Sequence, residues 1–372
     1  MDSQEIRKLA KNLVNYSTKL QKGEKVLIEG TSLCLELVLE IIKEVYKVGA
    51  YPFVRIGDDE VTREILKQAN SEQMELMAKY MKPQMEDMDA YIGISATDNI
   101  NELNEVSVSQ RNLYSKLYNK PIHSDIRVAK TKWVILQYPT KGFAQKANMS
   151  TNEYADFYFK VCNLDYSKMN NAMNNLKTLM EKTDKVRIKA QDTDLTFSIK
   201  GIPAIKCAGE MNIPDGEIYT APVKDSVNGY IHYNTPSSYN GITFENVKLY
   251  FENGKIVNCE SKNNQDKLES IFNIDEGARY VGEFALGVNP YITKPMTNIL
   301  FDEKISGSIH FTPGASYDDA FNGNKSAVHW DLVLIQTPEF GGGEIYFDDK
   351  LIRKDGLFVE PSLMCLNPEH LQ

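Results

Sequence analysis

Hydrophobic and polar positions follow two different rhythms along the chain, and the rhythm changes near residue 185. Up to that point, short apolar stretches of strand length alternate with longer stretches whose apolar residues recur at helical spacing. Strands that alternate with helices are typical of βαβ units around a mostly parallel sheet. The pattern predicts a first helix within 1–20, strands at 24–30, 50–57, 88–96 and 131–140, and helices at 34–49, 62–81 and 107–119.

After residue 185 alternating strands and turn residues dominate. The clearest signal is FENGK at 251–255, where an Asn-Gly pair separates two alternating stretches, as in a β-hairpin. One helix is predicted near 262–273, and a polar helical segment covers 166–184, just before the change of rhythm. We therefore expect an N-terminal α/β domain with a mostly parallel sheet over 1–185. A β-rich, barrel-like C-terminal domain is expected over 186–372.

The α/β pattern alone suggests a dinucleotide-binding fold, but the first strand does not support it. The strand at 24–30 is followed by GTSLCLE, which contains no GxGxxG at the turn into the helix. That glycine pattern lets a backbone approach a pyrophosphate closely. Nucleotide binding is therefore a poor explanation of the first domain.

Composition narrows the class of protein. The 372 residues are 42% apolar and 25% charged, as in soluble globular proteins with room for two cores. The net charge is -9 and no basic cluster is present, which argues against nucleic acid and against an anionic membrane as partners. There is no run of eighteen apolar residues, and the N-terminal stretch lacks the apolar core of a signal peptide. A cytoplasmic protein is expected.

Cysteine usage supports the same compartment. The five cysteines are far apart, odd in number and never in a CxxC pair. This pattern fits reduced thiols better than a disulfide framework. It also argues against a thiolate zinc site.

Two polar residues interrupt an apolar strand at 326–334, SAVHWDLVL. Alternation places His329 and Asp331 on one face, with Val328 and Trp330 on the other. Since an unpaired buried charge costs several kcal/mol, roughly, the aspartate needs a partner. A hydrogen-bonded His and Asp would suffice, and so would two ligands of one metal ion.

Further candidate ligands lie in the same half of the chain. His310 is in the alternating strand ISGSIHF, Glu217 opens the strand EIYTAP, and Glu283 sits among apolar neighbours in RYVGEFALG. Tyr317 lies in a loop seven residues after His310. Each residue alone has an ordinary explanation, such as a solvated carboxylate or a packed aromatic ring. Together the two histidines and three carboxylates form a nitrogen and oxygen donor set suited to two divalent ions.

Four blocks of this half resemble, in order, the signature blocks of the M29 family of metal-dependent aminopeptidases, the thermophilic aminopeptidase or aminopeptidase S/T group. The blocks are NIPDGEIYTAP (212–222), GEFALGVN (282–289), FDEKISGSIHFTPGASY (301–317) and NKSAVHWDLVL (324–334). The resemblance extends upstream to 138–157 and covers most of the chain. Four blocks in order are far more specific than one.

The resemblance implies roles for these residues. The metal ligands would be Glu217, Glu283, His310, His329 and Asp331, with Glu283 bridging two divalent ions (zinc, cobalt, manganese or magnesium). Tyr317 matches the active-site tyrosine of the family and would stabilise the oxyanion. One departure is that His310 is followed by Phe311, Thr312 and Pro313 instead of small apolar residues. This departure concerns the wall of the pocket more than the ligands.

The resemblance also implies an exopeptidase acting on short peptides. A two-metal-activated water would attack the scissile carbonyl, and one ion would hold the free α-amine. A homodimer is implied, with the first domain supplying a cavity wall and part of the dimer contact. No separate general base is evident.

Three alternatives stay open. A ring-opening iron dioxygenase of the same fold would use a mononuclear site. A non-catalytic peptide-binding relative would keep the fold with an inactive site. In the third reading, His329 and Asp331 make internal hydrogen bonds and bind no metal.

Overall fold

The structure is a computed structural model that describes residues 3–372. By compactness the chain divides into two units. The first unit comprises Met1–Asn163 and Gly209–Pro214, and the second comprises Leu164–Ala208 and Asp215–Gln372. The polar helix α8 (Tyr166–Lys182), which we placed before the domain boundary, lies in the second unit.

The first unit is built on a five-stranded sheet with the strand order β2-β1-β3-β4-β8. All neighbouring strands are parallel, which confirms the predicted α/β region with a parallel sheet. Its strands are β1 (Lys25–Thr31), β2 (Tyr51–Gly57), β3 (Ala90–Ser95), β4 (Lys132–Gln137) and β8 (Asn212–Ile213). Its main helices are α1 (Ser3–Asn12), α2 (Leu35–Val48), α3 (Asp59–Gln68), α4 (Ser71–Glu86), α5 (Val108–Tyr114), the π-helical η1 (Leu13–Ser17) and η4 (Ser115–Val128), α6 (Lys141–Lys146) and α7 (Thr151–Cys162).

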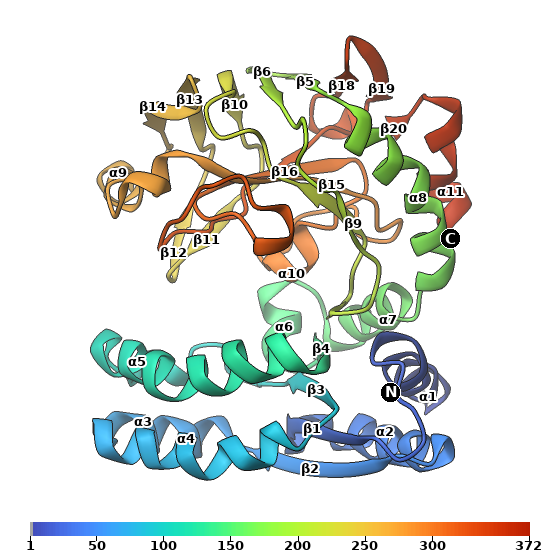
Figure 1. Cartoon of the computed structure of the whole chain (residues 1–372), viewed down its shortest axis with the longest axis vertical. Coiled ribbons are helices and arrows are strands. Elements are labelled where there is room, and N and C mark those ends of the chain that lie inside the picture. Colours follow the sequence, from blue (N-terminus) through green and yellow to red (C-terminus); the bar gives the residue numbers. More distant parts are fainter. Residues whose placement is uncertain (1–2) are drawn as a thin grey trace. The chain divides into compact units, whose positions relative to one another are not determined.

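Helices cover the two faces of this sheet (Figure 1). On one face, Met81 and Met85 of α4 pack with Ile122 of η4 against Leu27 of β1. After β2 the chain reverses its direction along the sheet, and crossovers between parallel strands are right-handed. The helix α2 between β1 and β2 therefore lies on the opposite face. It ends as predicted at Gly49, which has the left-handed φ of 78°.

The predicted helix at 62–81 is wrong in one respect, because the structure forms two helices there. The first, α3, ends at Gln68, and Ala69 adopts an extended conformation. Asn70 then caps α4, since its side-chain oxygen accepts a hydrogen bond of 2.9 Å from the backbone N–H of Gln73. Hydrophobic spacing alone does not detect this break, although an asparagine cap is a recognised start signal.

The second unit contains an eight-stranded and a five-stranded antiparallel sheet. The eight-stranded sheet has the order β14-β13-β10-β6-β5-β18-β19-β20, and the five-stranded sheet has the order β17-β16-β15-β9-β7. The first comprises β5 (Lys185–Ala190), β6 (Thr193–Ser198), β10 (Asn228–His232), β13 (Lys248–Glu252), β14 (Lys255–Glu260), β18 (Gly343–Phe347), β19 (Lys350–Lys354) and β20 (Leu357–Phe358). The second comprises β7 (Ile205–Cys207), β9 (Glu217–Thr220), β15 (Val281–Gly287), β16 (Ser308–Pro313) and β17 (Val333–Ile335).

Shorter elements complete this unit. They are the hairpin β11 (Ser237–Tyr239) and β12 (Ile242–Phe244), the helices α9 (Gln265–Phe272), α10 (Ile299–Asp302) and α11 (Pro368–Leu371), and the 3-10 turns Glu276–Arg279, Asp318–Ala320, Pro338–Phe340 and Pro361–Leu366. The predicted helix near 262–273 is confirmed by α9. The predicted hairpin is confirmed as well, because Asn253 and Gly254 connect β13 to β14 with φ values of 48° and 83°.

Aromatic side chains form the core between the two sheets. The ring of Phe197, on β6, lies 5.0 Å from the rings of both Phe284 and Phe311, which belong to β15 and β16. The two sheets therefore pack face to face. Both strand orders are open rows, so the described residues form no closed barrel, and our barrel-like expectation is corrected to two packed sheets.

No helix among residues 3–372 is both long and apolar enough to span a membrane. The five cysteines are free thiols.

Candidate metal centre

All five expected ligands lie on or beside the five-stranded antiparallel sheet of the second unit. Glu217 is the first residue of β9, Glu283 lies in the middle of β15, and His310 lies in β16. His329 and Asp331 precede β17. In the register of the sheet, His310 pairs with Ala285 and Glu217 pairs with Gly287. Because side chains alternate, the polar residues share the face opposite the aromatic core.

The strand predicted at 326–334 is shorter than expected. Only Val333–Ile335 forms a regular strand, and His329 makes an isolated bridge with Gly314. The neighbouring strand ends at Pro313, which has no N–H to donate, and Gly314 turns the chain at a φ of 110°. The alternation still holds, because Val328 and Trp330 are buried on the core side.

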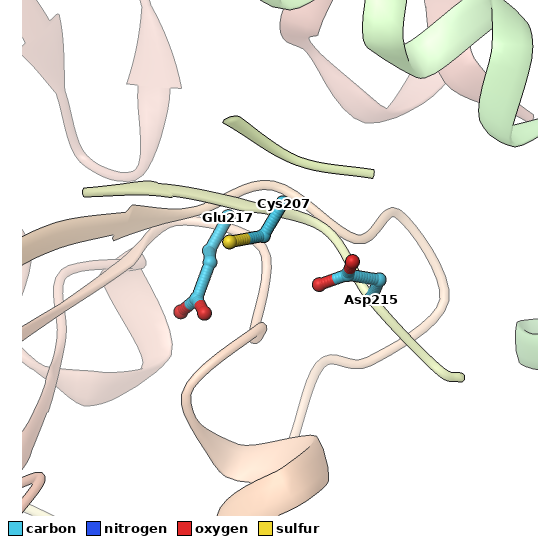
Figure 2. Close-up of side chains that lie close together, drawn as sticks. All are labelled: Cys207, Asp215 and Glu217. Carbon is cyan, nitrogen blue, oxygen red and sulfur yellow. The ribbon is translucent and has the colours of Figure 1, made fainter. Parts of the chain in front are cut away.

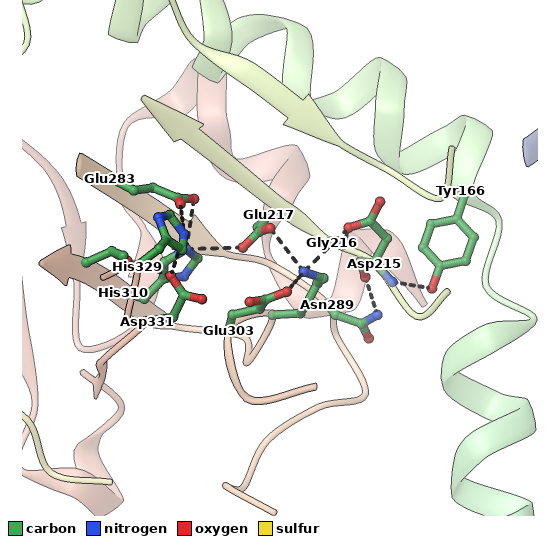
Figure 3. A network of polar contacts seen from close by, with 12 residues as sticks. Tyr166, Asp215, Gly216, Glu217, Glu283, Asn289, Glu303, His310, His329 and Asp331 are labelled. Carbon is green, nitrogen blue, oxygen red and sulfur yellow. Dashed lines mark hydrogen bonds and ion pairs between the residues drawn. The ribbon is translucent and has the colours of Figure 1, made fainter. Parts of the chain in front are cut away.

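Four short distances join these side chains around Glu283 (Figure 3). Nε2 of His310 lies 3.1 Å from Oε1 of Glu283 and 3.5 Å from Oε2 of Glu217. Nε2 of His329 lies 3.3 Å from the other oxygen of Glu283 and 3.4 Å from Oδ1 of Asp331. The side chains thus form two groups of three, Glu217–Glu283–His310 and Glu283–His329–Asp331, each with its ligand atoms within 4.8 Å of one another. Glu283 belongs to both.

Outer hydrogen bonds fix the orientation of two of these side chains. Nδ1 of His329 lies 2.8 Å from the carbonyl oxygen of Ala315, to which it donates. Nε2 of the same ring is then left facing the carboxylates. The hydroxyl of Thr312 donates a hydrogen bond of 2.7 Å to Oδ1 of Asp331. Metal-ligating side chains characteristically have such outer partners.

Three buried atoms of the cluster have no hydrogen-bond partner among the described residues, namely Oε2 of Glu217, Nδ1 of His310 and Nε2 of His329. Burying a polar atom without a partner is costly. Oε2 of Glu217 and Nε2 of His329 are lone-pair donors of the kind that divalent ions take, and both face other members of the groups described above. The residues therefore fit divalent metal ions.

In the cluster, neighbouring charges and burial shift the pKa values of four ligands in opposite directions. Burial lowers the pKa of His310 and His329, but nearby carboxylates raise these values to about 10 and about 11. Burial raises the pKa of Glu283, yet the two histidines beside its carboxylate bring it below the ordinary value. The pKa of Asp331 is likewise low, chiefly because His329 outweighs its burial. Protons on the histidines therefore balance the carboxylates in the metal-free protein.

Tyr317 lies at the edge of the cluster. Its ring centroid is 4.7 Å from that of His329 and 5.6 Å from that of Tyr219. The side chain is about half exposed, with a fractional exposure of 48%. The two ring contacts hold the tyrosine beside the ligands while leaving it accessible.

A residue that the sequence does not reveal is Lys304, whose side chain is fully buried. Its Nζ lies 3.0 Å from Oε1 of Glu217 and 3.8 Å from Oδ1 of Asp215, and it also contacts the carboxylate of Glu303. Burial lowers the pKa of this ammonium, but the three carboxylates raise it well above the ordinary value. In the sequence, Lys304 follows a glutamate, as in many solvated surface segments, so no pattern marks it.

The chain belongs to the M29 family of metalloproteases. The profile of this family, described as "Thermophilic metalloprotease (M29)", matches residues 2–341. The family predicted from the four sequence blocks is thus confirmed.

Similar proteins carry aminopeptidase names. The chain is 28% identical over 372 residues to Aminopeptidase AmpS of Bacillus subtilis, covering 89% of each protein. Among solved structures, wild-type AmpT from Thermus thermophilus shares the fold with a TM-score of 0.81 at 22% identity, over 96% of this chain and 99% of that one. The 2,5-dihydroxypyridine dioxygenase of Pseudomonas putida has a TM-score of 0.60 at 12% identity, over 98% and 99%. These structural likenesses concern the fold.

Proposed function

We propose that this protein is a metal-dependent aminopeptidase that removes N-terminal residues from short peptides. The observation that carries the proposal is the pair of three-residue groups that share Glu283. A carboxylate with one oxygen directed at each group has the arrangement of a bridging ligand between two ions. Family membership and the aminopeptidase names of the relatives support the same reaction.

We assign the ligands as Glu217, Glu283, His310, His329 and Asp331. Two divalent ions bound there would supply an activated water and polarise the scissile carbonyl. The protein itself provides the orientation of the ligands through Ala315 and Thr312, and it keeps water from the buried carboxylates.

Tyr317 is proposed to donate a hydrogen bond to the oxyanion that forms at the scissile carbonyl. Its ring lies against His329 and about half of the side chain is exposed, so the tyrosine is accessible beside the ligand cluster. A donor preorganised in this way stabilises the negative charge that develops in the transition state.

The dioxygenase alternative is less well supported. A mononuclear iron site needs one group of ligands, whereas this chain keeps two adjoining groups. The likeness to the dioxygenase is a likeness of fold. A non-catalytic peptide-binding role is disfavoured because it would not require five intact donors.

The test is hydrolysis of a panel of aminoacyl p-nitroanilides by chelator-stripped protein, with Zn²⁺, Co²⁺, Mn²⁺ or Mg²⁺ added back singly. We expect metal-restored release of p-nitroaniline. Matched substrates with an acetylated α-amine should not be cleaved, since an exopeptidase requires the free amine. If no ion restores hydrolysis although metal binding is measured, the aminopeptidase proposal is refuted. An assay with Fe²⁺, O₂ and a dihydroxypyridine would then test the dioxygenase.

A homodimer in the cytoplasm is also proposed, and the edge strand β2 of the first unit supports the dimer. Four of its apolar side chains, Tyr51, Phe53, Val54 and Ile56, are at least 40% exposed. They lie on both faces of a strand whose outer edge is unpaired in the strand order of the sheet. An apolar edge of this kind is a template for pairing with another strand, and a second copy around a twofold axis offers an identical one. A cavity wall formed by the first domain stays a prediction.

A further inference from the structure

A third group of metal-type donors adjoins the two already described. Cys207, Asp215 and Glu217 each offer a donor atom, and these atoms lie within 4.8 Å of one another (Figure 2). The group shares Glu217 with the Glu217–Glu283–His310 group. Judged by its donors alone, it would extend the centre to a third ion and would bring a thiol into it.

A side chain of the protein already supplies a cation to this group. Nζ of Lys304 is 3.0 Å from Glu217 and 3.8 Å from Asp215, and it contacts Glu303. The lysine side chain has no exposed surface. In Figure 3 Glu217 lies between Glu283 and Asp215, so the carboxylates that contact Lys304 begin at the end of the row of ligands. Three carboxylates around a buried ammonium are the pairing that a buried charge requires.

Hydrogen bonds from Asn289 hold the segment that carries Lys304 and the segment that carries Asp215 at a fixed spacing. The backbone N–H of Asn289 donates to the carbonyl oxygen of Lys304 at 3.0 Å, and the Asn289 side chain donates to that of Asp215 at 2.7 Å. Between these residues, Gly216 adopts a φ of 130°, and a Cβ there would lie 2.9 Å from the Cβ of Asn289. The position of the ammonium relative to Glu217 is therefore built into the fold.

Glu217 has two oxygens with different partners. Oε1 accepts the hydrogen bond from Lys304, whereas Oε2 has no hydrogen-bond partner among the described residues and faces Nε2 of His310 at 3.5 Å. The lysine thus takes one oxygen and leaves the other for a metal ion.

We infer that Lys304 is a built-in cation of the metal centre, a positioning residue that restricts Glu217 to one metal-binding oxygen and occupies the Cys207–Asp215–Glu217 group in place of a third ion. The centre consequently takes only the ions of the two Glu283 groups and keeps the Cys207 thiol out of the coordination sphere. The inference rests on the proposed function to the extent that it takes Glu217 as a ligand.

Cobalt(II) titration of the metal-free protein tests this role. Co²⁺ bound by a thiolate has a ligand-to-metal charge-transfer absorption in the near ultraviolet that nitrogen and oxygen ligands lack. The parent should bind Co²⁺ without this absorption. Lys304→Ala should bind one further equivalent of Co²⁺ and show the thiolate absorption. The double variant Lys304→Ala/Cys207→Ser should not show this absorption. Lys304→Arg keeps a cation and should behave like the parent.

Two results would overturn the inference. One is a thiolate absorption in the parent that Cys207→Ser abolishes, because the ammonium would then not occupy the group. This comparison needs no change at Lys304 and decides the matter even if Lys304→Ala does not fold. The other is a folded Lys304→Ala variant with the stoichiometry and spectrum of the parent. Neither readout requires peptide hydrolysis, so a parent that binds Co²⁺ as expected but cleaves no peptide would refute the proposed function alone.

Discussion

The hydroxyl of Thr312 donates a hydrogen bond of 2.7 Å to Oδ1 of Asp331, and both residues lie beside the two histidines of the candidate metal centre. The strand β16 that carries Thr312 also carries His310, two residues earlier. One strand therefore provides a proposed ligand directly and orients a second one from outside. This arrangement predicts a measurable effect of a residue that does not itself bind metal.

Thr312→Val is expected to weaken metal binding by about 10- to 100-fold, the usual effect of removing an outer hydrogen bond to a ligand. Valine has nearly the same shape, so the buried position stays filled. Affinity is measured by competition with a chromogenic chelator. Thr312→Ser retains the hydroxyl and should stay near the parent value. Equal affinities for the valine and serine variants would contradict the proposed contribution of this hydrogen bond.

Glu283→Gln should give a folded protein with at least about 100-fold lower activity, because loss of a direct ligand exceeds the effect of losing an outer one. It should also bind fewer metal ions, since Glu283 belongs to both groups. Metal content and p-nitroanilide hydrolysis are measured on the same preparation. Glu269→Gln, at an exposed position of α9, is the matched control. Parent-like activity in Glu283→Gln would refute the bridging role.

Much of this site follows from sequence, and the part that does not has a physical reason. His329 and Asp331 are detectable because they interrupt an apolar alternation, and the fold confirms that alternation. Glu217 and Glu283 are individually ambiguous, and only the ordered blocks group them. Lys304 leaves no pattern, since its burial depends on the carboxylates of Asp215 and Glu217, which a distant segment of the chain brings to it.

For the fold as well, some features could be predicted from the sequence and others could not. Alternating strands and helices predict the parallel sheet, and Asn253-Gly254 predicts a hairpin, because these signals are local. Closure of the β-rich half into a barrel depends on which distant strands pair. Val333–Ile335 pairs with β16 at the edge of the five-stranded sheet and pairs with no further strand within residues 3–372. Local alternation contains no information about that edge.

Tyr317→Phe should lower kcat by roughly 100-fold while leaving metal content and KM nearly unchanged. The hydroxyl is proposed to act only on the oxyanion, and loss of one such donor typically has this effect. The ring contact with His329 at 4.7 Å remains available to phenylalanine, so the ligands should not move. Steady-state kinetics and metal analysis together check the prediction. A parent-like kcat, or a loss of metal, would remove Tyr317 from its proposed role.

The metal-free protein should lose stability at alkaline pH. The pKa values of His310 and His329 are raised to about 10 and about 11, above the value of about 6.5 expected for unfolded histidine. Groups with raised folded pKa values stabilise the fold fully below the unfolded pKa and cease to do so as pH rises through the folded values. Ligated histidines are neutral, so the metal-bound protein does not depend on these protons.

The increase in Tm caused by metal should therefore grow with pH. Differential scanning fluorimetry with and without metal, between about pH 6 and pH 10, measures it. The expected pattern is a Tm that falls steadily above about pH 7 for the chelator-treated protein and a flatter curve for the metal-loaded one. Two parallel curves would show that the histidine protons do not stabilise the metal-free fold.

Charges placed on the outer edge of β2 should separate the proposed dimer into monomers. Phe53→Lys and Ile56→Lys place ammonium groups on opposite faces of this strand, where side chains are exposed and the first unit does not need them for its core. Light scattering after size exclusion should give twice 42.2 kDa for the parent and 42.2 kDa for the double variant. Val257→Lys, on the edge strand β14 of the other unit, is 49% exposed before substitution and should leave the dimer intact. A monomeric parent would refute the proposed dimer. If the double variant is still a dimer, the dimer contact does not involve β2.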